Sequence, residues 1–240
     1  MKKFLFFLLF FSILNKPFLK AEELRSNILV LVDLSTSYFN PEFMKRLDTT
    51  LGYVNKTILT GVTYLPLNMM IQFLPIKEQS IISDTICEVE FAKRNLAGRQ
   101  LGSGISKKKE LKLFLDDCKK LILEQKEGKA TDITGAIRKA VLIANSQLPQ
   151  GEPRIVIILS DFEEDRALIY KKEKELSFKD FSFALIYPGQ LVEDKKSGEA
   201  KEVLNYAEAL KSRLLKQGAD KVGLYISGAD FSKKIRRDLF

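Results

Sequence analysis

Short apolar runs alternate with longer amphipathic stretches along most of the chain, and this alternation restricts the fold more than any other feature. The runs have the length of β-strands, and most stretches between them have helical periodicity. Their order predicts a three-layer, doubly wound (Rossmann-like) α/β fold with a mainly parallel sheet, helices on both faces and one antiparallel edge strand. The predicted order is β, α, β, β, α, α, β, α, β, α, β, α, with strands at 28–32, 67–74, about 85–91, within 154–161, at 181–187 and at 221–227.

Proline and capping residues predict several element boundaries. The "NPE" at 40–42 has a cap residue, a proline and an acid in the order of a helix start. Pro66 and Pro75 are expected to flank the second strand. Helical periodicity predicts a further helix over 131–146 and a docked final helix from about Asp230.

Residues 1–21 have the pattern of a secretory signal peptide. Two lysines precede an unbroken apolar run at 4–14, and a small residue, Ala21, precedes an acidic pair. The run is shorter than the roughly 20 apolar residues that span a bilayer. We expect a cleaved leader and a single domain over 24–240, in a periplasmic or secreted protein of a bacterial envelope; an uncleaved membrane anchor is the alternative.

The charge of the chain gives little reason to expect a nucleic-acid partner. Residues 1–21 hold four lysines and no acid, so the formal net charge of +8 falls to +4 without them. No long basic tract with interleaved aromatic residues is present. We expect no nucleic acid, and membrane contact only through an uncleaved leader.

The chain contains no histidine. This excludes Ser-His-Asp and Cys-His catalysis within the chain, together with the usual His-ligated zinc sites. Cys87 and Cys118 each continue an apolar stripe and are expected to face a core. The sequence leaves open whether they are two buried thiols or a disulfide.

Acidic and hydroxyl residues follow two of the predicted strands and precede one predicted helix. Asp33 and Asp161 come at the ends of buried strands, and "KATDITGAI" opens the helix at 131–146. Ligands of doubly wound sheets bind outside the carboxyl ends of the strands. If these loops meet there, they form an all-oxygen cluster suited to Mg²⁺ or Mn²⁺, made of Asp33, Ser35, Ser37, Thr131 and Asp161.

Each of these residues also has a structural explanation. The hydroxyl residues at 35–37 could be turn or cap residues, Thr131 could be the N-cap of its helix, and Asp161 could cap the helix that follows. The neighbouring acids are expected to be solvated charges at helix starts, favoured by the helix dipole: Asp132, Glu163, Glu164 and Asp165.

The same pattern resembles the von Willebrand factor type A domain with its metal-ion-dependent adhesion site. The resemblance rests on D-x-S-x-S at 33–37, Thr131 in "TDITGAI" and Asp161 in "ILSDF", and it covers essentially the whole chain after the leader. It implies that these residues hold a divalent cation. Two departures concern the rim of the site: Phe162 stands where the family usually has glycine, and the stretch between 37 and 131 is long.

The resemblance implies a binding function without catalysis. Neutral hydroxyl ligands would leave positive charge on the cation, so that it could bind a carboxylate of a partner protein. One alternative is a metal-free scaffold subunit of an envelope complex. A second is a Mg²⁺-dependent phosphodiesterase, phosphatase or nuclease that uses Asp33, Asp132 and Asp161 as a carboxylate cage.

Overall fold

The computed structural model of the chain describes residues 26–35, 41–61, 69–91, 95–96, 99–100, 104–126, 128–164, 176–188 and 198–238. The strands are β1 (Ser26–Asp33), β2 (Met69–Ile76), β3 (Cys87–Phe91), β4 (Asn95–Leu96), β5 (Arg99–Gln100), β6 (Arg154–Leu159), β7 (Phe181–Ile186) and β8 (Lys221–Tyr225). The helices are α2 (Pro41–Gly61), the 3-10 helix η2 (Ser80–Ile82), α3 (Gly104–Leu123), α4 (Ile133–Gln147), α6 (Gly198–Lys216) and α7 (Gly228–Asp238). The predicted leader and the predicted ligand Ser37 lie outside the described residues, and residues 165–175, where a helix was expected between β6 and β7, are also outside them.

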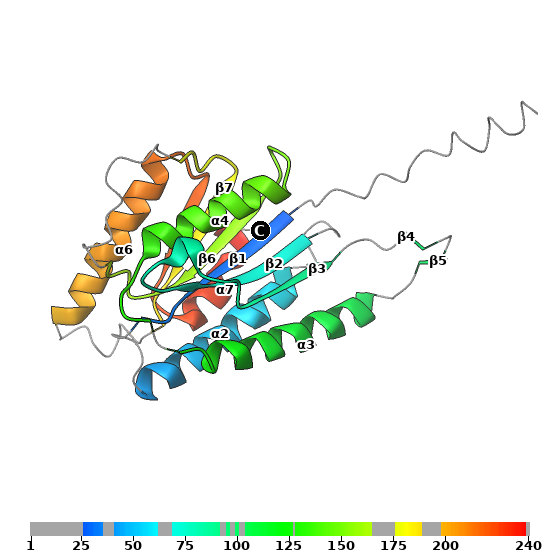
Figure 1. Ribbon diagram of the computed structural model, residues 1–240, viewed down its shortest axis with the longest axis horizontal. Helices are drawn as coiled ribbons and strands as arrows, with labels where there is room; N and C mark the ends of the chain where they lie inside the picture. The colour runs from blue at the N-terminus through cyan, green and yellow to red at the C-terminus, as the bar shows by residue number, and fades with distance from the viewer. Residues whose placement is uncertain are drawn as a thin grey trace, which may run out of the picture.

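Six strands form one sheet in the order β3-β2-β1-β6-β7-β8 (Figure 1). All neighbouring strands are parallel except β2 and β3, which pair antiparallel at one edge. The predicted sheet is therefore confirmed. The chain moves outward from β1 on one side and from β6 on the other, so the strand order reverses between these two strands. Such a switch point is where α/β sheets bind their ligands.

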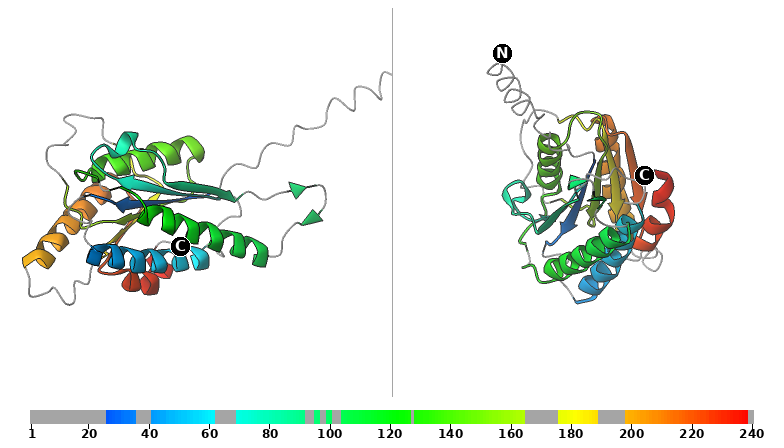
Figure 2. Two further views of the ribbon diagram at one scale, coloured as in Figure 1. Left: turned by 60° about the horizontal axis from the view of Figure 1, so that its bottom comes forward. Right: turned by 90° about the vertical axis from the view of Figure 1, so that its right-hand side faces the viewer.

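Alternate residues of the central strands pack against opposite helix layers, as the pleat of a strand requires. In β1, Ile28 and Val30 belong to the core formed with α2, α3 and α7, while Leu29 and Leu31 belong to the core formed with α4 and α6. Figure 2 shows these layers on the two sides of the sheet. Burial on both faces explains why the strand is continuously apolar.

The second strand continues through Pro75, so the prediction that Pro75 lies beyond its end is wrong. Phe73 O accepts a hydrogen bond from Ile86 N (2.8 Å) on the β3 side, whereas Ile76 O accepts one from Leu34 N (3.1 Å) on the β1 side. Strand residues two apart point the same way, so the nitrogen of Pro75 faces the β3 side, where the pairing with β3 has already ended. Its missing N–H therefore interrupts no ladder.

The final helix docks on the body of the domain, as predicted. Phe231 of α7 is fully buried, and its ring packs edge to face on Tyr225, with the ring centroids 5.1 Å apart. At the start of α7, Gly228 lies against α2, because a Cβ on Gly228 would come within 3.1 Å of the Cα of Thr50. Glycine permits this close approach of two helices.

A disulfide joins Cys87 of β3 to Cys118 of α3, with the Cα atoms 5.9 Å apart. Cys118 is buried and Cys87 packs against the same core, as expected from their apolar stripes. The structure thus decides between the two alternatives that the sequence left open. The bond fixes the antiparallel edge strand to the helix that covers it.

None of the helices in the described part of the chain combines the length and the apolar character that crossing a bilayer requires.

Candidate functional site

The carboxyl ends of β1 and β6 bring two of the three predicted site segments together. Asp33 is the last residue of β1, and Asp161 follows the end of β6 by two residues. The two strands are in register with Val32 opposite Leu159, so Asp33 and Ser160 come next on adjacent strands. The adjacency of Asp33 and Asp161 at this edge follows from the parallel pairing, which the sequence alone could only suggest.

Asp33 is held by a hydrogen bond on each carboxylate oxygen. Its Oδ1 accepts from the backbone N–H of Ser35 (3.0 Å), and its Oδ2 accepts from the hydroxyl of Ser160 (2.6 Å). The residue is 1% exposed. Burial raises the pKa of Asp33 to about 6, although the hydrogen bonds from Ser160 and Ser35 act in the opposite direction.

Asp161 lies close enough to Asp33 for the two charges to interact. Burial raises the pKa of Asp161 to about 8, and the negative charge of Asp33 adds to the rise. Oδ1 of Asp161 accepts a hydrogen bond from Glu163 N (2.9 Å), which partly opposes the shift. Among the described contacts, the carboxylate of Asp161 therefore has a backbone N–H as its partner and no Lys or Arg side chain.

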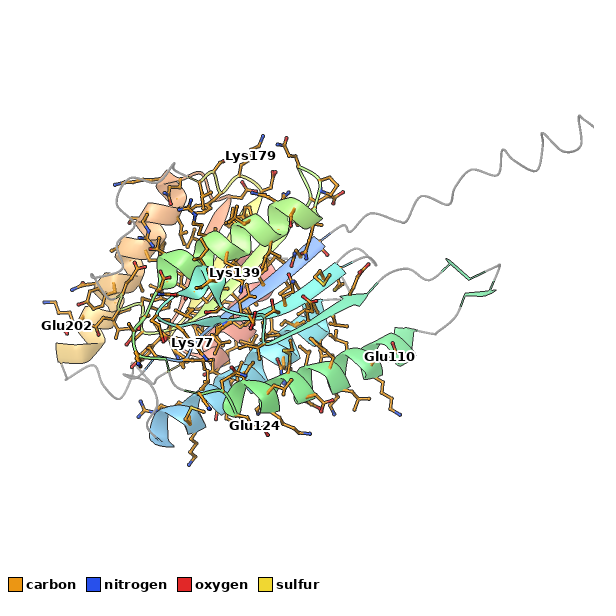
Figure 3. The ribbon with its side chains drawn as sticks, viewed as in Figure 1. Lys77, Glu110, Glu124, Lys139, Lys179 and Glu202 are labelled. Carbon is orange, nitrogen blue, oxygen red and sulfur yellow. A yellow bond between two sulfur atoms is a disulfide. The ribbon has the colours of Figure 1, made fainter. Side chains whose placement is uncertain are left out.

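The segment before Thr131 is attached to the same edge by backbone contacts. Gly128 N donates to Leu34 O (2.7 Å), and Ser35 forms a β-bridge with Gly128. A Cβ on Gly128 would come within 3.0 Å of the Lys77 side chain, which Figure 3 labels beyond the end of β2. The segment therefore fits closely between the ends of β1 and β2, and Thr131, three residues further along the chain, is buried with 5% exposure.

Glu78 holds the next residue of this segment. Its Oε2 accepts a hydrogen bond from Lys129 N (2.8 Å). The pKa of Glu78 is lowered, chiefly because its own backbone N–H and that of Lys129 donate to the carboxylate. The role of Glu78 could not be predicted from the sequence, because it depends on a partner 51 residues away.

The N-cap of α4 is Asp132, so Thr131 is not the cap of this helix. Asp132 is fully buried; its Oδ1 accepts from Gly135 N (2.8 Å) and its Oδ2 accepts from Ser80 N (3.1 Å). The expectation that Asp132 is a solvated charge is wrong, because its carboxylate ties the start of α4 to the turn after β2.

Two further acids follow Asp161, and they differ in their surroundings. Glu163 is exposed, as expected. Glu164 is not a solvated charge: its Oε1 accepts from Thr134 N at the start of α4 (2.6 Å), and its Oε2 lies 3.7 Å from Arg213 of α6. Glu164 therefore joins the segment that follows β6 to the helices α4 and α6. Asp165 lies outside the described residues.

Phe162, at the position where the resembled family usually has glycine, has a positive φ of 66°. This left-handed conformation costs an L-residue with a large side chain about 1 to 2 kcal/mol. The ring is 4% exposed and packs in the core between the sheet and the helices α4 and α6. Burial of the ring thus offsets the energetic cost of a backbone conformation that glycine would adopt freely.

Ser160 is a second residue at this edge whose role was not predicted from the sequence. Its hydroxyl contacts Asp33, and it is fully buried. The only signal in the sequence was a hydroxyl residue between a buried strand and Asp161, in "IILSDF". A serine there is equally compatible with a strand end, so the contact needed the tertiary structure.

The donor set is compatible with a hard divalent cation. Asp33, Ser35, Thr131 and Asp161 offer only oxygen, which Mg²⁺ and Mn²⁺ prefer. Within the described residues no group of three or more His, Cys, Asp or Glu side chains could hold a metal. A cation at this edge would therefore need the hydroxyl oxygens as well as the two carboxylates.

No protein-family model matches the chain, and no curated protein matches it. Similar solved structures include a von Willebrand factor type A protein from Catenulispora acidiphila, with 13% identity, a TM-score of 0.43, and coverage of 89% of this chain and 41% of that one. The pilus adhesin SpaC from Lactobacillus rhamnosus GG has 11% identity and a TM-score of 0.45, with coverage of 90% and 29%.

A third similar structure is proximal thread matrix protein 1 from the mussel byssus, solved with a zinc-occupied MIDAS motif. It has 14% identity and a TM-score of 0.41, with coverage of 89% of this chain and 44% of that one. The chain spans less than half the length of each of these three proteins. The family that the sequence motifs resemble is thus represented among these similar structures.

Proposed function

We propose that the chain is an exported, divalent-cation-dependent protein-binding module, of the kind found in adhesion or in envelope complexes. The observation that carries this proposal is the pair of Asp33 and Asp161 at the β1–β6 switch point, where burial raises the pKa of both carboxyl groups and the charge of Asp33 adds to the rise for Asp161. Two neighbouring carboxylates in such a place are unfavourable when both are ionised. A bound cation would reverse that penalty.

Asp33, Ser35, Thr131 and Asp161 would hold the cation, with Ser37, two residues after Ser35 in the sequence, as a fifth ligand. When bound, Mg²⁺ or Mn²⁺ would supply an open coordination position for a carboxylate, because its hydroxyl ligands leave positive charge uncompensated. The partner would be a protein that offers an Asp or Glu side chain. The chain's own residues orient the ligands: Ser35 N and Ser160 hold Asp33, and Glu163 N holds Asp161.

Binding is supported over catalysis by the chemistry of the described residues. The enzyme alternative requires Asp132 as the third acid of a cage, but both oxygens of Asp132 accept structural hydrogen bonds from backbone N–H groups. Two acids would then remain, and both have raised pKa values. The chain also contains no histidine to act as a general base.

Export is supported by two independent features. Residues 1–21 have the pattern of a signal peptide, followed by the domain over 24–240. The Cys87–Cys118 disulfide is typical of proteins that fold in an oxidising compartment such as the periplasm or the exterior. We therefore propose a periplasmic or secreted location in a bacterial envelope.

Thermal melting with 1 mM Mg²⁺, 1 mM Mn²⁺ or EDTA tests the cation. We expect at least one cation to raise the melting temperature of the wild type and to leave Asp33→Ala unchanged, since a ligand at 100 times its Kd adds about 2.7 kcal/mol. Asp48→Ala is the matched control, because Asp48 is a half-exposed acid paired with Lys119. A wild type that no cation stabilises would contradict the proposal and favour the alternative function, a metal-free scaffold subunit.

A peptide array tests the partner chemistry. Peptides with one Asp or Glu would be compared with matched Asn and Gln peptides, in Mn²⁺ and in EDTA. We expect binding only to acidic peptides and only with the cation. Hydrolysis of a generic phosphodiester by the wild type, but not by Asp33→Ala, would instead favour the enzyme.

A further inference from the structure

One hydroxyl group connects two separate segments of the candidate site. Ser160 Oγ donates a 2.6 Å hydrogen bond to Oδ2 of Asp33 and accepts a 2.9 Å hydrogen bond from Phe162 N. Ser160 is fully buried, and its own N–H donates to Ile186 O of β7 (3.3 Å). The residue is thus fixed from a third strand while it contacts the ends of β1 and β6.

We infer that Ser160 is a positioning residue of the metal site, an inference that rests on the proposed function. Its hydroxyl holds the Asp33 carboxylate in one orientation and ties that orientation to the backbone around Asp161. Because the Ser160 hydroxyl already donates its proton to Asp33 and accepts from Phe162 N, it acts through these two residues and not as a ligand itself.

The contacts on Asp33 explain why this one hydroxyl matters. A carboxylate at the end of a strand can rotate about its side-chain bonds, and each of the two hydrogen bonds restrains one oxygen. Ser35 is only two residues from Asp33 in the chain, so the Ser35 N–H moves together with Asp33. The hydroxyl of Ser160 comes from the neighbouring strand and restrains Asp33 relative to the rest of the site.

The contact with Phe162 extends this restraint to the segment that contains Asp161. Phe162 has a left-handed backbone, with φ at 66°, directly after Asp161. The hydrogen bond from Phe162 N to Ser160 Oγ helps to hold that conformation, in which Asp161 lies beside Asp33. Loss of the hydroxyl would therefore loosen both proposed carboxylate ligands at once.

Ser80 provides a matched control for Ser160. It is also fully buried, and its hydroxyl also donates one hydrogen bond and accepts one, to Lys77 O (2.9 Å) and from Lys77 N (3.0 Å). Replacing Ser80 with alanine should disturb the fold to a similar degree without removing a contact to Asp33. Ser160→Thr keeps the hydroxyl and serves as the rescue variant.

The first measurement is the Mn²⁺ dissociation constant by calorimetry, together with the melting temperature in EDTA. We expect Ser160→Ala to weaken Mn²⁺ binding about tenfold or more, as is typical for residues that orient metal ligands. Ser80→Ala should weaken it less than about threefold at a similar loss of melting temperature, and Ser160→Thr should restore most of the affinity. Equal weakening by the two alanine variants, or none by Ser160→Ala, would overturn the inference.

The second measurement needs no metal and separates this inference from the proposed function. In EDTA, Asp33→Asn should shift the NMR signal of the Phe162 amide through Ser160, and this shift should disappear in the Ser160→Ala background. If wild type binds no Mn²⁺, the proposed function fails, and the coupling in EDTA still shows whether Ser160 positions Asp33. An unchanged shift in the Ser160→Ala background would overturn the positioning role.

Discussion

The carboxylates of Asp33 and Asp161 lie beside each other at the ends of two adjacent parallel strands, and the charge of Asp33 raises the pKa of Asp161. Both carboxylates are largely buried, and the pKa values reach about 6 for Asp33 and about 8 for Asp161. This relationship has a direct consequence for how the stability of the metal-free protein depends on pH.

We expect the metal-free protein to lose stability as the pH rises from 5 to 8.5. A carboxyl group with a raised pKa in the folded state binds its proton more tightly when folded, so its contribution to stability is full below its ordinary pKa and is lost as the pH rises through the folded value. Urea unfolding in EDTA at pH 5, 7 and 8.5 measures this effect. Asp161→Asn should flatten the profile, and an identical profile in wild type and variant would contradict the raised pKa.

A divalent cation should act in the opposite direction along the same pH range. Cation binding requires ionised carboxylates, so protonation competes with it. We expect the stabilisation by Mn²⁺ to be small at pH 5 and to grow towards pH 8. Melting temperatures with and without Mn²⁺ at each pH measure this growth, and Asp48→Asn serves as a control that should follow the wild type. A Mn²⁺ effect that does not change with pH would argue for binding elsewhere.

Glycine should be better tolerated than alanine at position 162. Phe162→Ala removes the buried ring and keeps the strained φ, so we expect a loss of about 3 to 5 kcal/mol in unfolding free energy. Phe162→Gly removes the same ring but relieves the backbone, which should return about 1 kcal/mol. Urea denaturation ranks the two variants. A glycine variant less stable than the alanine variant would show that the positive φ carries no strain.

Asp132→Ala should destabilise the fold with little direct effect on cation binding. The variant loses an N-cap, at about 1 kcal/mol, and leaves the buried Ser80 N–H without its acceptor, at about 1 to 3 kcal/mol. Urea denaturation gives the loss of stability, and Mn²⁺ titration at a temperature where the variant is folded gives the affinity. Loss of Mn²⁺ binding by more than about tenfold would instead place Asp132 among the ligands, as in the carboxylate cage.

Reduction of the Cys87–Cys118 disulfide should destabilise the protein by about 3 to 4 kcal/mol, because the bond closes a loop between residues 31 apart. Urea unfolding with and without dithiothreitol measures the loss. The Cys87→Ser, Cys118→Ser double variant is the control and should not respond to dithiothreitol. Two reactive thiols in the oxidised wild type would contradict the bond.

The fold class and the positions of Asp33 and Asp161 at strand ends followed from local patterns. The continuous apolar runs of β1 and β6 are visible in the sequence because both faces of a buried parallel strand need apolar residues. Asp33 and Asp161 could be placed at strand ends for the same reason. Cleavage of residues 1–21 and the metal-binding roles of Asp33, Ser35, Ser37, Thr131 and Asp161 remain predictions.

Other features depended on distant partners and could not be predicted. Asp132 looked like a solvated helix-start charge, yet it is buried because the turn at Ser80 packs over the start of α4. Pro75 looked like the end of a strand, yet β2 continues because its proline nitrogen faces a side where β3 no longer pairs. In each case the environment of the residue depends on which distant segment of the chain packs beside it.

The sequence by itself determined the doubly wound architecture and the strand ends at which Asp33 and Asp161 lie, since hydrophobic periodicity and strand-end residues are local properties of the chain. Only the tertiary structure decided the strand order, the disulfide and the contact of Ser160 with Asp33. Strand order sets which loops become neighbours, and a hydrogen bond between residues 127 positions apart exists only after β1 and β6 have paired.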